Sequence, residues 1–267
     1  HMGYDIASQK KAYGMPLDLQ ATNDKTLQMV WGPGTFGYSP SQLRLFKLEQ
    51  GVPINLDKVR FDTANHGRSG GEPLATVEDM SSWVMSVLDT LDISEAALVG
   101  HSLGSLIALE CAASHGDRVR AIALVGTTSP MPVSDAILNA AEADDHAAFD
   151  MLTQWGFSKR HQFGGNRNSG IWMIGNTLRL YERSGPGVLF HDMRACNEYT
   201  SGTDQASKVT CPALLILGAE DRLTPVRSTR ALQEAIQSPL VEVLPGAGHT
   251  IMVEAPNAML DALHKVL

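Results

Sequence analysis

The sequence predicts an α/β fold, a mostly parallel, twisted sheet flanked by helices. Short apolar runs alternate with longer segments of helical periodicity, which is typical of parallel strands joined by crossover helices. Most of these runs are apolar throughout, as expected for strands buried on both faces. At 267 residues, with 43% hydrophobic and 19% charged residues, the chain is long enough to bury a large core. The expected strands span residues 26–31, 58–62, 96–100, 121–126, 213–218 and 240–244.

Helices are expected between these strands. One begins near Thr76 and Asp79, which occupy capping positions and are followed by apolar residues at helical spacing. A second is expected over residues 102–115 and is closed by Gly116. The last segment, residues 253–267, has the pattern of a closing amphipathic helix.

Residues 130–198 interrupt the alternation, because they contain no convincing strand and show several helical patterns instead. We interpret this block as a helical insertion over one end of the sheet. The expected α/β core then consists of residues 3–129 and 199–267. His1 and Met2 resemble the remainder of a purification tag and are not expected to belong to the fold.

The net charge limits the kinds of partner that we expect, and the cysteines indicate the kind of compartment. A net charge of -8 disfavours nucleic acid and anionic membrane surfaces, because phosphate groups are bound by basic faces. No segment is apolar and long enough to span a bilayer, and no export signal is visible. Cys111, Cys196 and Cys211 form no C-x-x-C pair, which favours buried thiols in a reducing compartment. We expect a cytoplasmic protein that acts on a small molecule; a homodimer is left open.

Residues 100–104, Gly-His-Ser-Leu-Gly, match the pattern G-x-S-x-G, which places a nucleophilic serine on a sharp turn. The motif directly follows an expected strand and directly precedes an expected helix. Glycines on both sides of Ser102 permit a turn in which larger side chains would clash. The start of the helix adds N–H groups that can stabilise developing negative charge. The alternative is that Ser102 only caps this helix.

A nucleophilic serine needs a base, and the base needs an acid that orients it. Asp221 follows the fifth expected strand and His249 follows the sixth. Because the carboxyl ends of parallel strands meet at one edge of a sheet, we expect both side chains near Ser102. The chain order Ser, Asp, His is that of hydrolases with the G-x-S-x-G turn. Glu220 is the rival acid.

The remaining histidines are given other roles. His101, next to the serine, is expected to pack rather than to act as a second base. His66 is expected to hold its own loop through hydrogen bonds, whereas His161 and His191 are expected to be solvated. None of the His, Asp and Glu spacings resembles a metal site.

Four segments, in this order along the chain, resemble the α/β-hydrolase superfamily: FDTANHGRSGG, GHSLGS, LGAEDRLTP and PGAGHTIMVEAP. In the first of them, an asparagine stands where the family usually has a glycine. The resemblance covers residues 25–267 and implies the α/β-hydrolase fold with Ser102, Asp221 and His249 as a catalytic triad. The block at 130–198 stands where that family carries a helical lid (cap).

The resemblance also implies two N–H donors in an oxyanion hole. One is the backbone N–H of Leu103, the residue after the nucleophile. The family usually places the second donor after a His-Gly pair, but this chain has MVWGPGTFGYSP, without a histidine. If Trp-Gly replaces that pair, the donor position falls on Pro33, which has no N–H. If Pro-Gly replaces it, the donor is Thr35, which is the register we favour.

Large apolar residues of the helical block are expected to line a pocket above the serine, with Trp155, Phe163, Trp172 and Met173 as the substrate-binding candidates. We therefore predict an enzyme, a serine hydrolase that cleaves a carboxylic ester, lactone or thioester of an apolar or aromatic small molecule. The reaction passes through an acyl-enzyme on Ser102 and needs no metal or organic cofactor. The alternatives are a carbon–carbon bond hydrolase or perhydrolase of the same fold. In another class, the alternative is a receptor-like homologue that binds a ligand and turns over slowly.

Overall fold

The computed structural model describes Ala64, His66, Ser69 and residues 71–165 and 171–267. It also describes the backbone of two short antiparallel strands, β1 (Leu48–Glu49) and β2 (Val52–Pro53). The strands expected at 26–31 and 58–62 lie outside the described residues.

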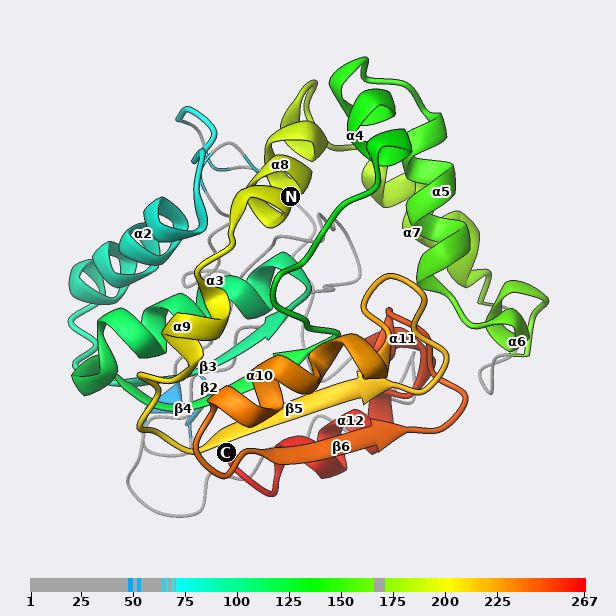
Figure 1. Cartoon of the computed structure of the whole chain (residues 1–267). Helices are drawn as coiled ribbons and strands as arrows, with labels where there is room; N and C mark the ends of the chain where they lie inside the picture. The colour runs from blue at the N-terminus through cyan, green and yellow to red at the C-terminus, as the bar shows by residue number, and fades with distance from the viewer. Residues whose placement is uncertain are drawn as a thin grey trace.

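Four parallel strands form the central sheet of the described chain, in the order β3-β4-β5-β6 (Figure 1). Val99 pairs with Ala123, and Ile216 pairs with Glu242 in the same parallel sense. The four strands expected from residue 96 onward are confirmed, although the second begins two residues early, at Val119. Their bounds are β3 (Ala96–His101), β4 (Val119–Val125), β5 (Ala213–Gly218) and β6 (Leu240–Leu244).

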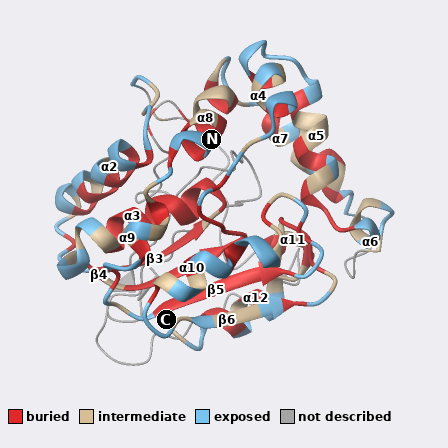
Figure 2. Ribbon diagram, in the orientation of Figure 1, coloured by how far each residue is buried: buried red, intermediate tan, exposed pale blue. Residues whose placement is uncertain are grey.

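Alternate residues of these strands pack against helices on opposite faces of the sheet. Leu98 and Leu124 belong to a cluster shared with α2, α3, α9 and α10, whereas Val99 and Val125 belong to one shared with α12. The sheet is therefore a middle layer, and Figure 2 shows β3 to β5 as its buried centre. The helices are α2 (Val77–Thr90), α3 (Leu103–Ser114), α9 (Gly202–Ala206), α10 (Arg230–Ala235) and α12 (Pro256–Leu263).

The two expected helices on the first face are confirmed. Thr76 caps α2, because its hydroxyl accepts the N–H of Asp79 at 3.0 Å. α3 ends at Ser114, and Gly116 does not close it but opens the 3-10 turn η2 (Gly116–Arg118). Every residue of α3 from Leu103 to Ala112 is buried, because the helix is covered by α2 and α9 as well as by the sheet.

Two expectations about the end of the chain are corrected. β6 is not buried on both faces, since Leu240 and Val243 are 37% and 44% exposed at the last strand of the order. The closing helix is two helices, α11 (Ile251–Glu254) and α12. The break falls where Pro256 occupies the first turn of α12, a position at which proline starts a helix but cannot continue one.

The described part of residues 130–198 contains helices and no strand, as the sequence predicts. These helices carry a small core of their own, which includes Ile137, Leu152 and Met193. In Figure 1, α4, α5 and α7 stand away from the sheet. The division of the chain at 130 and 198 stays a prediction. The helices are α4 (Asp135–Glu142), α5 (Ala147–Gly156), α6 (Lys159–Gln162), α7 (Met173–Tyr181) and α8 (Val188–Glu198).

In the part of the chain that the structure describes, no helix combines the length and the apolar character that crossing a membrane requires.

Candidate active site

Ser102 lies on the turn between β3 and α3. Its φ of 54° and ψ of -123° are backbone angles that a residue with a side chain rarely adopts, and such strain is concentrated at functional sites. The turn is tight because a Cβ on Gly100 would overlap the carbonyl group of Gly104, so only glycine allows α3 to start this close to β3. The Ser102 N–H donates to the carbonyl oxygen of Val125 at 2.9 Å, which ties the turn to β4.

The Ser102 side chain does not cap α3, so the alternative explanation for this serine does not hold. Instead Ser105, one turn into the helix, donates its hydroxyl to the Ser102 carbonyl oxygen at 2.6 Å. The Ser105 hydroxyl also lies 2.8 Å from that of Thr127. Sequence reasoning missed this support, although Ser105 is the last letter of the quoted GHSLGS.

Asp221 and His249 meet, although their loops follow different strands. The Nδ1 atom of His249 lies 2.8 Å from Oδ2 of Asp221, and both side chains are buried. The Oδ1 atom of Asp221 accepts the backbone N–H groups of Leu223 and Thr224 at 2.9 and 2.8 Å, and the Thr224 hydroxyl donates to Oδ2 at 2.7 Å. The rival acid, Glu220, is exposed.

These contacts set the charge of Asp221. Burial alone would raise the pKa of its carboxyl group, but the charge of His249 and the hydrogen bond from His249 act in the opposite direction, as do the bonds from Thr224. The net result is a pKa of Asp221 well below its usual value. Asp221 is therefore an anion that holds a proton on Nδ1 of His249 and leaves Nε2 free to accept one. Thr224 is a second supporting residue that the sequence analysis did not single out.

His101 packs against His249, with ring centroids 4.6 Å apart. Its Nε2–H donates to the backbone carbonyl oxygen of His249 at 2.9 Å. Burial first, and then the charge of His249, lower the pKa of His101 to about 3, so its ring is neutral near pH 7. His101 therefore supports the main chain of His249, in agreement with the packing role expected from the sequence.

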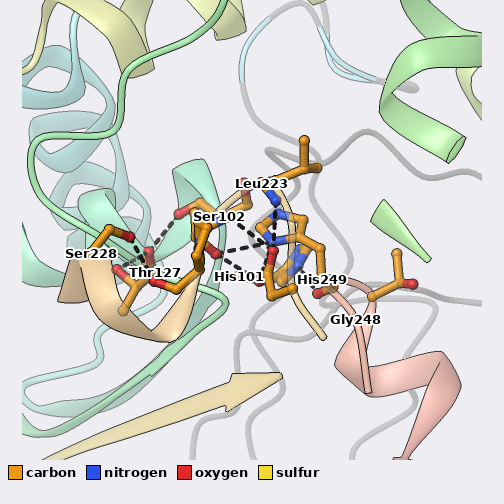
Figure 3. Close-up of polar contacts among 12 residues, drawn as sticks. His101, Ser102, Thr127, Leu223, Ser228, Gly248 and His249 are labelled. Atoms are coloured by element: carbon orange, nitrogen blue, oxygen red, sulfur yellow. Dashed lines mark hydrogen bonds and ion pairs between the residues drawn. The ribbon is translucent and has the colours of Figure 1, made fainter. Parts of the chain in front are cut away.

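Ser102 and His249 lie close together, with His101 as a neighbour of both (Figure 3). A Cβ on Gly126 would lie 3.1 Å from Nδ1 of His249 and 3.3 Å from Cδ2 of His101, the residue before Ser102. Among the described residues the Ser102 hydroxyl makes no hydrogen bond to the His249 ring. Such bonds are often long without substrate and tighten when it binds.

The expected oxyanion donors are only partly described. The N–H of Leu103 is the first of α3, and the first N–H groups of a helix have no acceptor within it. Thr35 and Pro33 lie outside the described residues. No group of three or more His, Cys, Asp or Glu side chains suited to a metal ion occurs in the described ranges.

The four substrate-binding candidates lie on the helical segment but differ in burial. Met173 is buried at the start of α7, and Trp155 is half-buried on α5. Phe163 and Trp172 are 87% and 68% exposed. The role of these four residues in binding stays a prediction.

This arrangement of sheet, helices and strand-end loops is the α/β-hydrolase fold. The chain belongs to the alpha/beta hydrolase family, whose family model matches residues 30–262. A pimeloyl-(acyl-carrier protein) methyl ester esterase of Chromobacterium violaceum is 31% identical over 178 residues, which cover 63% of this chain and 68% of the relative. The 3-oxoadipate enol-lactonase 1 of Acinetobacter baylyi is 24% identical and covers 76% of this chain and 75% of its own length.

A solved thermophilic esterase superposes with a TM-score of 0.65 and 26% identity over 76% of this chain and 77% of that one. The similarity to these esterases and to the lactonase supports a hydrolase of this fold.

Proposed function

We propose that the protein is a serine hydrolase that cleaves a carboxylic ester, lactone or thioester of an apolar or aromatic small molecule. The observation that carries the proposal is the 2.8 Å contact between Asp221 and His249 beside the strained turn of Ser102. An acid, a histidine and a serine at the carboxyl ends of three strands of one parallel sheet are the elements of nucleophilic acyl transfer.

In the proposed reaction, Ser102 Oγ attacks the carbonyl carbon while Nε2 of His249 takes its proton. The carbonyl oxygen becomes an oxyanion, which accepts the N–H of Leu103 and, as we propose, that of Thr35. The tetrahedral intermediate collapses, the carbon–oxygen or carbon–sulfur bond breaks, and the leaving group takes the proton from His249. Water then attacks the acyl-enzyme with His249 as base, the bond between the acyl carbon and Ser102 Oγ breaks, Ser102 regains a proton from His249, and the acid product leaves. Asp221 stabilises the imidazolium that forms in both halves of the reaction.

The names of the relatives support an oxygen ester or lactone as the first substrate class to test. One relative is an esterase for a methyl ester and another is an enol-lactonase, and both bonds present an acyl carbon to the same attack. The apolar side chains on α5 and α7 support an apolar acyl group.

The test compares the protein with Ser102→Ala and with Ser86→Ala, a control on the exposed face of α2. Each is treated with a fluorophosphonate probe and then assayed on p-nitrophenyl esters of increasing chain length and on a lactone. We expect labelling and sustained turnover in the protein and the control, and loss of both in Ser102→Ala. Absence of labelling in the protein would exclude a nucleophilic Ser102. Labelling without turnover would favour the receptor-like alternative.

A further inference from the structure

A buried carboxylate, Glu254, lies five residues after His249 and is not used in the proposed reaction. It ends the short helix α11, and its side chain is fully buried. Its Oε1 atom accepts the N–H of Gly248 at 3.0 Å and the hydroxyl of Thr250 at 2.9 Å. Glu254 therefore holds the residues immediately before and after His249.

The other oxygen of Glu254 reaches the helical segment between β4 and β5. Its Oε2 atom accepts the N–H of Ser158 at 3.0 Å and lies 2.9 Å from Nδ1 of His161, whose side chain is only 9% exposed. The prediction that His161 is solvated is therefore wrong. His161 also contacts the Ser158 hydroxyl at 2.7 Å, so its ring joins the start of α6 to the carboxylate of Glu254 on α11.

The main chain makes the same connection. The carbonyl oxygen of Gly156, the last residue of α5, accepts the N–H of His249 at 2.7 Å and that of Thr250 at 3.3 Å. A Cβ on Gly248 would lie 2.6 Å from the Ser158 nitrogen and 2.9 Å from Oε1 of Glu254. The two segments touch so closely that only glycine fits at 248.

The His249 main chain is thus held on every side that the structure describes. Its N–H is bound by Gly156, its carbonyl oxygen by His101, and its two neighbours by Glu254. Because the side chain is attached to this main chain, the position of the main chain sets where the imidazole ring of His249 lies. A displacement of about 1 Å at a reacting group can cost about 100-fold in rate.

We propose that Glu254 is a positioning residue for His249, and that His161 joins the α5–α6 junction to the same carboxylate. The junction thereby helps to align the histidine with Asp221 and Ser102, so the helical segment contributes to the chemistry as well as to substrate contacts. This inference rests on the proposed function for its kinetic readout, but not for its structural one.

The decisive variant is Glu254→Gln, which keeps the shape of the side chain but directs an NH2 group at donors that need an acceptor. The matched control is Glu234→Gln, on the exposed side of α10, where the carboxylate pairs with Arg230. We expect Glu254→Gln to lower both kcat and the rate of fluorophosphonate labelling about 10- to 100-fold, with KM changed less than about twofold. His161→Gln takes away the donor at the position of Nδ1, because the NH2 group of glutamine lies one bond further along the side chain, so it should lower kcat about 3- to 10-fold.

Proton NMR of the His249 Nδ1–H that is bonded to Asp221 supplies a readout independent of turnover. We expect this resonance to shift or broaden in Glu254→Gln and to stay unchanged in Glu234→Gln. If the protein neither labels nor hydrolyses, the proposed function fails and the NMR comparison still decides the positioning role. If Glu254→Gln melts early, His161→Gln gives the decision. Wild-type kcat together with an unshifted resonance in a folded Glu254→Gln, or in His161→Gln when Glu254→Gln does not fold, would overturn the proposal.

Discussion

The active site at the strand ends and the outer end of the helical segment, by which we mean Phe163 and Trp172, differ in how many contacts hold their side chains. At the strand ends, Asp221 accepts three hydrogen bonds from two neighbouring residues besides the one from His249. The turn at Ser102 is supported by the hydroxyl of Ser105, which donates to the Ser102 carbonyl oxygen. At the outer end, by contrast, Phe163 and Trp172 expose most of their surface.

The two regions therefore differ in how freely their side chains can change conformation. An unpaired buried polar group costs free energy, so a fully bonded network such as that around Asp221 has few alternative arrangements and resists change. Exposed apolar side chains have no such constraint and can adapt to the shape of what they contact. The proposed chemistry needs the fixed geometry of the first region, and the second region contains residues that we predict to contact the substrate.

The largest effect is expected from Asp221→Asn. An asparagine would donate to Nδ1 of His249 or leave it without an acceptor, so the imidazole would lose the tautomer that accepts a proton from Ser102. We expect kcat to fall about 10⁴-fold, the size known for this change in serine proteases. Steady-state assays on a p-nitrophenyl ester measure it. Glu220→Gln, at the exposed neighbouring acid, should retain activity, and equal losses in both variants would contradict the assignment.

The second largest effect, a loss of stability, is expected from adding a side chain at the tight turn that carries Ser102. Gly100→Ala places a Cβ onto the carbonyl of Gly104, so we expect a loss of about 2–3 kcal/mol in the free energy of unfolding. Urea denaturation measures this loss. Gly116→Ala is the matched control, because its nearest neighbour would be 3.8 Å away and its φ is not positive. A Gly100→Ala variant as stable as the control would show that α3 can move away from β3.

A pH effect is expected from His101. Burial and the charge of His249 lower its pKa to about 3 in the folded protein, from the usual 6.5. Between these two values the unfolded chain binds a proton that the folded one does not, so stability falls as the pH falls. The contribution of His101 reaches about 1.4 kcal/mol per pH unit.

The His101→Asn variant should therefore lose less stability than the parent between pH 6.5 and 4. Urea midpoints at several pH values measure the difference, and His264→Asn, at an exposed histidine, serves as the control. Identical slopes in the parent and in His101→Asn would show that the His101 ring is protonated in the folded state.

The smallest effect on stability is expected at the outer end of the helical segment. Phe163→Ala and Trp172→Ala should change the free energy of unfolding by no more than about 0.5 kcal/mol, because both side chains are exposed. If they bind substrate as predicted, KM for long-chain esters should rise while kcat for acetate esters stays constant. Phe157→Ala, at a fully buried ring nearby, should cost about 3–5 kcal/mol. A comparable loss of stability in Trp172→Ala would remove the contrast between the two regions.

Much of the fold could be predicted, because strands and helices leave local patterns. The strands β3, β4 and β5 are apolar apart from Arg120 near the start of β4 and His101 at the end of β3, and Thr76 starts α2 as its capping chemistry indicates. The predictions were wrong where a proline or the position of a strand in the sheet outweighs the local pattern of apolar residues. The run of apolar residues after His249 continues across Pro256, yet proline divides it into two helices. The apolar residues of β6 do not reveal that this strand is the last one in the order of the described sheet.

The class of fold was predictable from the sequence alone, as were the turn that carries Ser102 and the two loops that carry Asp221 and His249. These follow from residue types at short spacing, which act through local backbone geometry. The contacts that hold His249 in place, by contrast, are visible only in the folded chain. His101 reaches it from 148 positions away, and Glu254 reaches Ser158 across 96. No local pattern encodes such pairs, because they form only when the sheet and the helical segment have packed together.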